Sequence, residues 1–132
     1  MFIMEDELKA LTEEKWHELV DRAFDSLPEP HRSAVANVAI VLEDDPTDYH
    51  REVSRITNHQ TLLGLYTGVP LPERHGRNDI SPDVITLFKN PLLGMSHDEA
   101  TLYENIRHTL WHEVAHYFGL DHDQIDTLDQ KV

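Results

Sequence analysis

The sequence predicts a single α+β domain that spans residues 1–132, and three observations support this class. The chain has the length of one domain, and a chain of this length buries a core without disulfides. Apolar residues recur at helical spacing in residues 12–27 and again after Ser96. Residues 38–43 and 83–89 are aliphatic and β-branched runs of strand length. The chain therefore combines helices and strands around one core.

The first helix is predicted over residues 12–27. Apolar side chains from Trp16 onward follow each other at intervals of three and four residues, and Pro28 ends the pattern. Thr12 is suited to cap the helix, because a threonine oxygen accepts a backbone N–H of the first turn. Trp16 is assigned to the core, and so is Trp111 further along the chain.

The middle of the chain is predicted to hold two strands and the loops around them. Residues 38–43 are an unbroken aliphatic run, which indicates a buried strand, and residues 83–89 indicate a second one. Glycines and prolines predict loops at residues 68–82 and 90–95. Residues 62–66 are compatible with either a strand or a helical turn.

The last predicted helix runs from Ser96 to Gly119. Ser96 is the expected N-cap, and Glu99 stands three residues later, as in a capping box. Apolar residues then recur every four positions, at Leu102, Ile106, Leu110, Val114 and Phe118. Gly119 ends the helix, because glycine readily takes the left-handed conformation of a C-terminal cap.

This helix carries the pattern H-E-x-x-H at His112, Glu113 and His116. Residues four apart on a helix lie on one face, with Cβ atoms about 5–6 Å apart, so both imidazoles can bind one Zn²⁺. Glu113 flanks the metal without binding it, and its carboxylate can accept a proton from water. The spacing predicts a zinc site with Glu113 as its catalytic base.

His122 is the predicted third zinc ligand. Gly119 lets the chain leave the helix at a sharp angle, so that His122 returns toward the metal. Three protein ligands leave a fourth position open for water, as catalytic zinc sites require. With 10 histidines in the chain, H-E-x-x-H alone arises by chance in roughly 7% of sequences of this composition. The longer pattern that includes Gly119 and His122 arises by chance in roughly 2 of 10,000 such sequences.

Composition excludes several other classes. The formal charge of −14 disfavours nucleic acid and anionic membrane surfaces as partners. The absence of cysteine excludes disulfides and thiolate metal sites. The sequence shows neither a signal peptide nor an apolar run of membrane-spanning length, so a cytoplasmic location is expected. No pattern in the sequence indicates an oligomeric state.

Three segments resemble a known family. The segments "GLYTGVPLPER", "SPDVITLFKNPLL" and "IRHTLWHEVAHYFGLDH", in this order, are similar to the small bacterial zincin-like metallopeptidases, described as minimal metalloproteases. The resemblance covers residues 27–126. The segment "HEVAHYFGLDH" also has the H-E-x-x-H-x-x-G-x-x-H pattern of metzincins.

The resemblance implies a minimal zincin-like fold with an N-terminal helix, a short mixed sheet and a C-terminal active-site helix. It also implies ligand roles for His112, His116 and His122. Members of the family often carry an acidic residue in place of the third histidine, so Asp121 and Asp123 compete with His122 for that role. Metzincins have a methionine turn after the motif, and the ten residues after His122 contain no methionine. Part of the metzincin substrate cleft is therefore expected to be missing.

Other polar residues are weaker candidates. His108 lies one turn before His112 and is expected to be a half-buried polar residue. The aspartates that follow the helix are expected to be solvated, although any of them could orient a ligand histidine. These are Asp121, Asp123, Asp126 and Asp129. The candidates for stabilising an oxyanion are Tyr66, Arg74, His75, Arg77 and Tyr117.

The sequence thus predicts a zinc-dependent metallopeptidase. Zinc polarises the scissile carbonyl of a peptide or protein substrate, and Glu113 moves the proton of the attacking water. Two rival functions remain. One is a zinc-binding interaction module that keeps the site without an efficient cleft, and the other is a hydrolase that acts on a different bond.

Overall fold

The computed structural model describes residues 8, 10–54, 62–75, 83–120 and 122–129. In this part of the chain, helices and a mixed sheet form an α+β fold, as predicted. The helices are α2 (Glu13–Asp25), α3 (His31–Ala34), α4 (Asp48–Ser54), α5 (Lys89–Gly94), α6 (Glu99–Tyr117) and α7 (His122–Asp129), with a 3-10 turn η1 (Leu71–Glu73). The strands are β1 (Val38–Glu43), β2 (Gly64–Thr67) and β3 (Asp83–Phe88).

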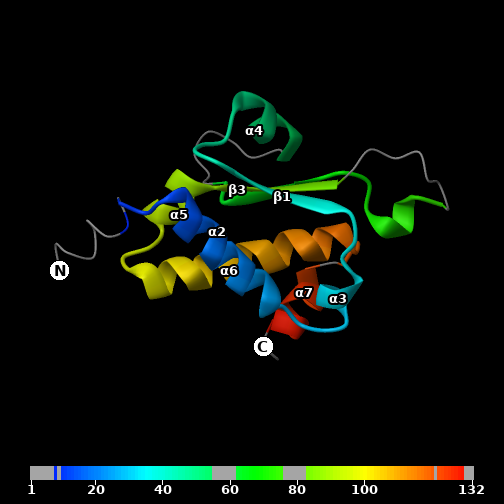
Figure 1. Ribbon diagram of the computed structural model, residues 1–132. Helices are drawn as coiled ribbons and strands as arrows, with labels where there is room; N and C mark the ends of the chain where they lie inside the picture. Colours follow the sequence, from blue (N-terminus) through cyan, green and yellow to red (C-terminus); the bar gives the residue numbers. More distant parts are fainter. Residues whose placement is uncertain (1–7, 9, 55–61, 76–82, 121, 130–132) are drawn as a thin grey trace.

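Helices lie on both sides of the sheet. α2 and α6 pack against each other on one side, and α4 lies on the other side (Figure 1). The main core forms where α2, β3 and α6 meet, and it includes Leu19, Ile85 and Leu110, which are fully buried. Trp16 and Trp111 are also buried there, which confirms their assignment to the core. Burial of these side chains is the main favourable contribution to folding.

The sheet is mixed, with the strand order β1-β3-β2. β1 pairs in parallel with β3, and β2 pairs antiparallel with β3. The segment 62–66, which the sequence left open between strand and helical turn, leads into strand β2 at Gly64. Because β2 is at the edge of the sheet and also contacts α6, it lies directly beside the helix that carries the H-E-x-x-H pattern.

β1 is not the buried strand that its aliphatic composition predicts. Its side chains alternate between half-buried and exposed, and Val41 keeps 40% of its surface exposed. β1 lies at the edge of the sheet, and only the face that carries Val38, Ile40 and Leu42 packs against the core. An aliphatic run shows that a strand is apolar, but coverage of its second face depends on what lies beside it in space.

The prediction of a loop at residues 90–95 is wrong, because most of this segment forms α5. Pro91 is the third residue of this helix. A proline is tolerated in the first turn of a helix, where the backbone N–H groups have no partner within the helix. The proline therefore marks the beginning of a helix here and not a loop.

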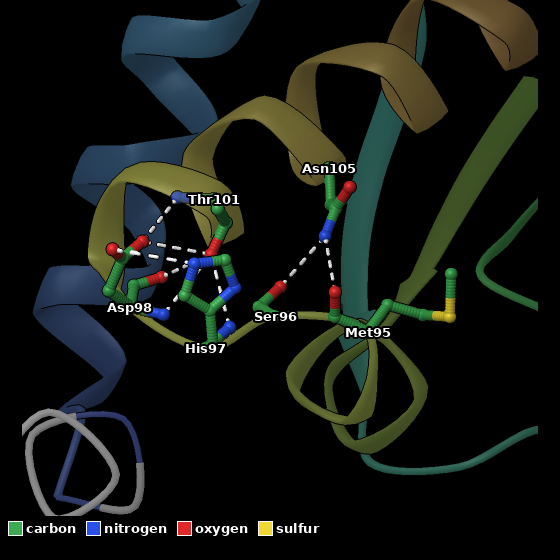
Figure 2. A network of polar contacts seen from close by, with 6 residues as sticks. All are labelled: Met95, Ser96, His97, Asp98, Thr101 and Asn105. Atoms are coloured by element: carbon green, nitrogen blue, oxygen red, sulfur yellow. Dashed lines mark hydrogen bonds and ion pairs between the residues drawn. The ribbon is translucent and has the colours of Figure 1, made fainter. Parts of the chain in front are cut away.

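α6 begins two residues later than predicted, because its N-cap is Asp98 and not Ser96. The Asp98 carboxylate accepts the backbone N–H of Thr101 at 2.8 Å, and Thr101 Oγ1 accepts the backbone N–H of Asp98 at 3.1 Å. Figure 2 shows this capping box. The Ser96 hydroxyl donates to the Leu92 carbonyl of α5 at 2.7 Å and accepts from Asn105 at 2.9 Å. The Ser96 hydroxyl therefore links α5 to α6 and does not cap α6.

The end of α6 follows the prediction. Gly119 has a φ of +75°. Its N–H donates to the His116 carbonyl, and the N–H of Leu120 donates to the Ala115 carbonyl, both at 3.0 Å. These two bonds form a Schellman cap, which turns the chain sharply away from the helix axis.

Two further helices, α4 and α7, have no counterpart among the predicted elements. Both are short, and short helices depend on tertiary packing more than on sequence propensity. Ile125 of α7 is fully buried in the main core, and its carbonyl accepts the indole N–H of Trp111. None of the helices within the described ranges is long and apolar enough to cross a bilayer.

Candidate metal centre on helix α6

The last two turns of α6 carry His112, Glu113 and His116. The three residues differ in burial. The side chain of Glu113 is only 11% exposed, whereas that of His116 is 43% exposed, and His112 is intermediate with its Nε2 atom shielded from solvent. The helix therefore presents two imidazoles one turn apart at the boundary between core and solvent, with a nearly buried carboxylate between them.

The Glu113 carboxylate is held through one oxygen. Its Oε1 accepts the backbone N–H of Tyr66 from β2 at 2.7 Å and faces the Nδ1 atom of His116 at 3.3 Å. Among the residues that the structure describes, Oε2 receives no hydrogen bond. One oxygen thus fixes the orientation of the carboxylate, and the other can still accept a hydrogen bond or a proton.

The hydrogen bond with Glu113 raises the pKa of His116, and burial of the ring opposes this shift only in part. The carboxylate therefore favours the protonated imidazole in the metal-free protein. Because Nδ1 faces Glu113, the Nε2 nitrogen of His116 is the one available to a metal. A carboxylate on the far nitrogen of a ligand histidine fixes its ring orientation and raises its basicity.

A close approach between β2 and α6 brings Tyr66 to Glu113. At Gly64 an added Cβ would lie 2.6 Å from Thr109 Cγ2, which is closer than real Cβ contacts. Glycine is required at this point, since any side chain would push the strand away from the helix. Tyr66 is two residues further along the same strand, so its N–H reaches Glu113 only while this contact is kept.

A cavity of about 180 Å³ opens beside the carboxylate. It is lined by Leu63, Gly64, His108, Thr109, His112 and Glu113. The His108 ring lies 4.3 Å from the His112 ring, centroid to centroid, with their planes tilted by 51°. His108 is exposed and not half-buried as expected. It forms part of the cavity wall.

The third ligand stays a prediction. Gly119 turns the chain as expected, and His122 is the first residue of α7. The side chain of His122 lies outside the described residues, as do Asp121 and the side chains of residues 126 and 129. Asp123 is described and is exposed in the first turn of α7. Within the described ranges, no three potential ligands are grouped closely enough to hold a metal.

The donor set fits zinc as far as it is described. Two neutral imidazoles one turn apart on a helix, with a carboxylate that does not need to bind the metal, are the ligand chemistry that Zn²⁺ accepts. No cysteine competes for it. Of the residues on α6 that the structure describes, His112 and His116 are the ones that could hold such a metal.

Three of the five residues considered for oxyanion stabilisation bind other groups through their polar atoms. The Tyr66 hydroxyl donates to Asp83 at 2.6 Å, and Arg74 forms an ion pair with the same carboxylate. The Tyr117 hydroxyl donates to the Ala36 carbonyl at 3.2 Å. His75 is exposed, and Arg77 lies outside the described residues. The contact to Glu113 comes from the backbone of Tyr66, which no side-chain pattern in the sequence could reveal.

A family model described as zincin-like metallopeptidase matches residues 35–132, from the strand β1 through the whole of α6 and α7. The chain belongs to the zincin-like metallopeptidase family. A comparison with curated proteins finds no match. Membership of this family implies zinc binding in general terms and agrees with the two imidazoles and the carboxylate on α6.

Proposed function

We propose that this zincin-like protein is a zinc-dependent peptidase in which Glu113 is the general base. One observation carries the proposal. The Glu113 carboxylate is held through Oε1 by the Tyr66 N–H and faces His116 of the same helix, while Oε2 receives no hydrogen bond from the described residues. A base needs this combination of fixed orientation and one free oxygen.

The proposed ligands are His112, His116 and His122, which makes the motif one of the metzincin type. Zinc, when bound, supplies Lewis acidity that polarises a carbonyl and lowers the pKa of water. Glu113 accepts a proton from the attacking water through Oε2 and delivers it to the leaving amide nitrogen. Tyr66 keeps Oε1 in place during both transfers, and His116 supports the same oxygen from the helix.

The proposed substrate is a peptide or protein. The acidic net charge of the chain favours some classes of partner over others. With 25 acidic against 11 basic residues, the surface repels nucleic acid and anionic membranes and attracts basic peptides. A cytoplasmic location is part of the same proposal.

The second candidate is a zinc-binding interaction module. It is favoured by the size of the cavity beside Glu113, about 180 Å³, because small-molecule sites are typically about 300–1,000 Å³. A site of this size accepts one side chain but does not by itself provide a cleft for a long substrate. In this case the metal would stabilise the junction of α6 and α7.

The test is hydrolysis of a mixed peptide pool by the full-length, zinc-loaded protein, followed by mass spectrometry of the products. Fragments that appear with the wild type and are absent with Glu113→Gln support the peptidase. The paired variant excludes a contaminating protease, which would cut in both samples. Stoichiometric zinc without any fragments contradicts the peptidase and favours the interaction module.

A further inference from the structure

Asp83, the first residue of β3, is a carboxylate that the proposed reaction does not use. It is only 3% exposed. A buried charge is costly unless partners compensate it. Its Oδ1 accepts the Tyr66 hydroxyl at 2.6 Å, and its Oδ2 pairs with the Arg74 guanidinium. Burial raises the pKa of the Tyr66 phenol, and the hydrogen bond to Asp83 raises it further, so the phenol stays protonated and donates.

Arg74 connects this carboxylate to the loop after β2 and to the end of α6. Its Nε donates to the Val69 carbonyl at 2.7 Å. Its guanidinium carbon lies 5.5 Å from the centre of the Tyr117 ring, a cation–π arrangement. Tyr117 directly follows the proposed ligand His116 on α6. Asp83, Arg74 and Tyr117 therefore join β3, the loop and the helix next to the candidate metal centre.

Close packing of the loop leaves Asp83 little freedom. At Gly68 an added Cβ would lie 2.1 Å from Asp83 Oδ1 and 2.8 Å from the Tyr66 hydroxyl. At Gly119, on the far side of the loop, an added Cβ would lie 2.8 Å from Pro72 Cγ. The loop is thus pressed between the Asp83 carboxylate and the turn that ends α6.

Tyr66 is held at both of its ends by these contacts. Its hydroxyl is bound to Asp83, and its backbone N–H is bound to Glu113 Oε1 at 2.7 Å. We infer that Asp83 is a positioning residue: it anchors Tyr66, and through the Tyr66 N–H it sets the orientation of the Glu113 carboxylate. This inference rests on the proposed role of Glu113 as the base, but the hydrogen bonds that carry it do not depend on peptidase activity.

The experiment measures the Tyr66 amide resonance in the full-length protein by two-dimensional ¹H–¹⁵N NMR. A hydrogen bond to an ionised acceptor is stronger than one to a neutral acceptor. In a protein that is otherwise wild type, Glu113→Gln should therefore weaken the bond from the Tyr66 N–H and shift its amide proton upfield. In the Asp83→Ala background we expect this Glu113-dependent shift to be lost. In the milder Asp83→Asn and Tyr66→Phe backgrounds we expect it to be reduced, and these variants serve if Asp83→Ala does not fold.

Leu19→Ala is the matched control. Leu19 is fully buried on α2, and its truncation lowers stability without removing any of the hydrogen bonds that join Asp83, Arg74 and Tyr66. It should therefore leave the Glu113-dependent shift of the Tyr66 amide unchanged. A purely structural role for Asp83 predicts the same result in Asp83→Asn as in Leu19→Ala. An undiminished shift in the Asp83 variants would overturn the inference, since pairing with β3 alone would then position Tyr66.

The NMR result is independent of the peptide-hydrolysis result, because the NMR measurement uses no substrate. Loss of the shift supports the inference even if no peptide is cut. If peptides are cut, a second readout applies: Asp83→Asn should lower kcat and leave KM nearly unchanged, whereas Leu19→Ala should leave both unchanged at a temperature where it is folded. An unchanged kcat in Asp83→Asn contradicts a positioning role.

Discussion

The backbone N–H of Tyr66 donates to Glu113 Oε1 at 2.7 Å, although the two residues are 47 positions apart in the chain. The donor belongs to the edge strand β2, and the acceptor belongs to α6. This bond links the strand to the one carboxylate that the H-E-x-x-H pattern singles out. It accounts for how Glu113 can be nearly buried and still keep a defined orientation.

Glu113→Gln should abolish most of any hydrolysis while zinc content stays near that of the wild type. Glutamine has nearly the same shape but cannot accept a proton, and general-base catalysis typically contributes on the order of 10²–10⁴-fold. The measurement is kcat/KM on a peptide that the wild type cuts, with zinc content determined by elemental analysis. Equal rates in the variant and the wild type would show that the assigned base is wrong.

The protein should bind one Zn²⁺ per chain, and more weakly as the pH falls, because a protonated imidazole cannot bind a metal. The pKa of His116 is raised, so protons compete with zinc at higher pH than for an ordinary histidine. As the pH falls, zinc affinity should therefore begin to decline at a higher pH than it would for a site made of ordinary histidines. Titration with zinc over this range checks it, and a pH-independent affinity contradicts imidazole ligation.

His122→Ala should reduce zinc affinity by a larger factor than either Asp121→Ala or Asp123→Ala. Loss of one of three protein ligands removes a direct bond to the metal, whereas loss of a group outside the ligand set typically costs about 10–100-fold. Competition with a chelator gives the three affinities. If one aspartate variant loses zinc and His122→Ala retains it, the aspartate is the third ligand.

Gly64→Ala should destabilise the fold by about 1–3 kcal/mol, the usual cost of overpacking. The added Cβ would lie 2.6 Å from Thr109 Cγ2, so β2 and α6 must move apart. The same movement should lengthen the bond between the Tyr66 N–H and Glu113. Urea unfolding measures the free energy, and the Tyr66 amide resonance reports the bond.

Gly94→Ala is the control for this comparison, because no atom lies within 4 Å of the added Cβ. Substitutions at such positions usually change the free energy of unfolding by no more than about 0.5 kcal/mol. Equal losses of stability in the two glycine variants would mean that the approach of β2 to α6 is not tight.

Much of the fold could be predicted from local patterns. The helix at residues 12–27 is observed as α2 with Thr12 as its cap, and the Thr12 oxygen accepts the Lys15 N–H at 3.1 Å. The strand at residues 83–89 is observed as β3. The errors have a common cause. The loop at Pro91 and the cap at Ser96 are predicted from nearby residues alone, but Pro91 lies in the first turn of α5, and the Ser96 hydroxyl is bound to α5 and to Asn105.

By itself the sequence determined that one helix carries two imidazoles on one face with a glutamate between them, and that a glycine turns the chain after it. Both are local properties, because residues four apart on a helix are neighbours whatever surrounds them, and glycine at +75° needs no distant partner. Only the tertiary structure decided which groups hold that glutamate and its neighbours. The Tyr66 N–H reaches Glu113 through a strand that Gly64 allows against α6, and Asp83 meets Arg74 across a loop. A backbone donor has no signature in the sequence, and contacts between distant segments arise only when packing brings them together.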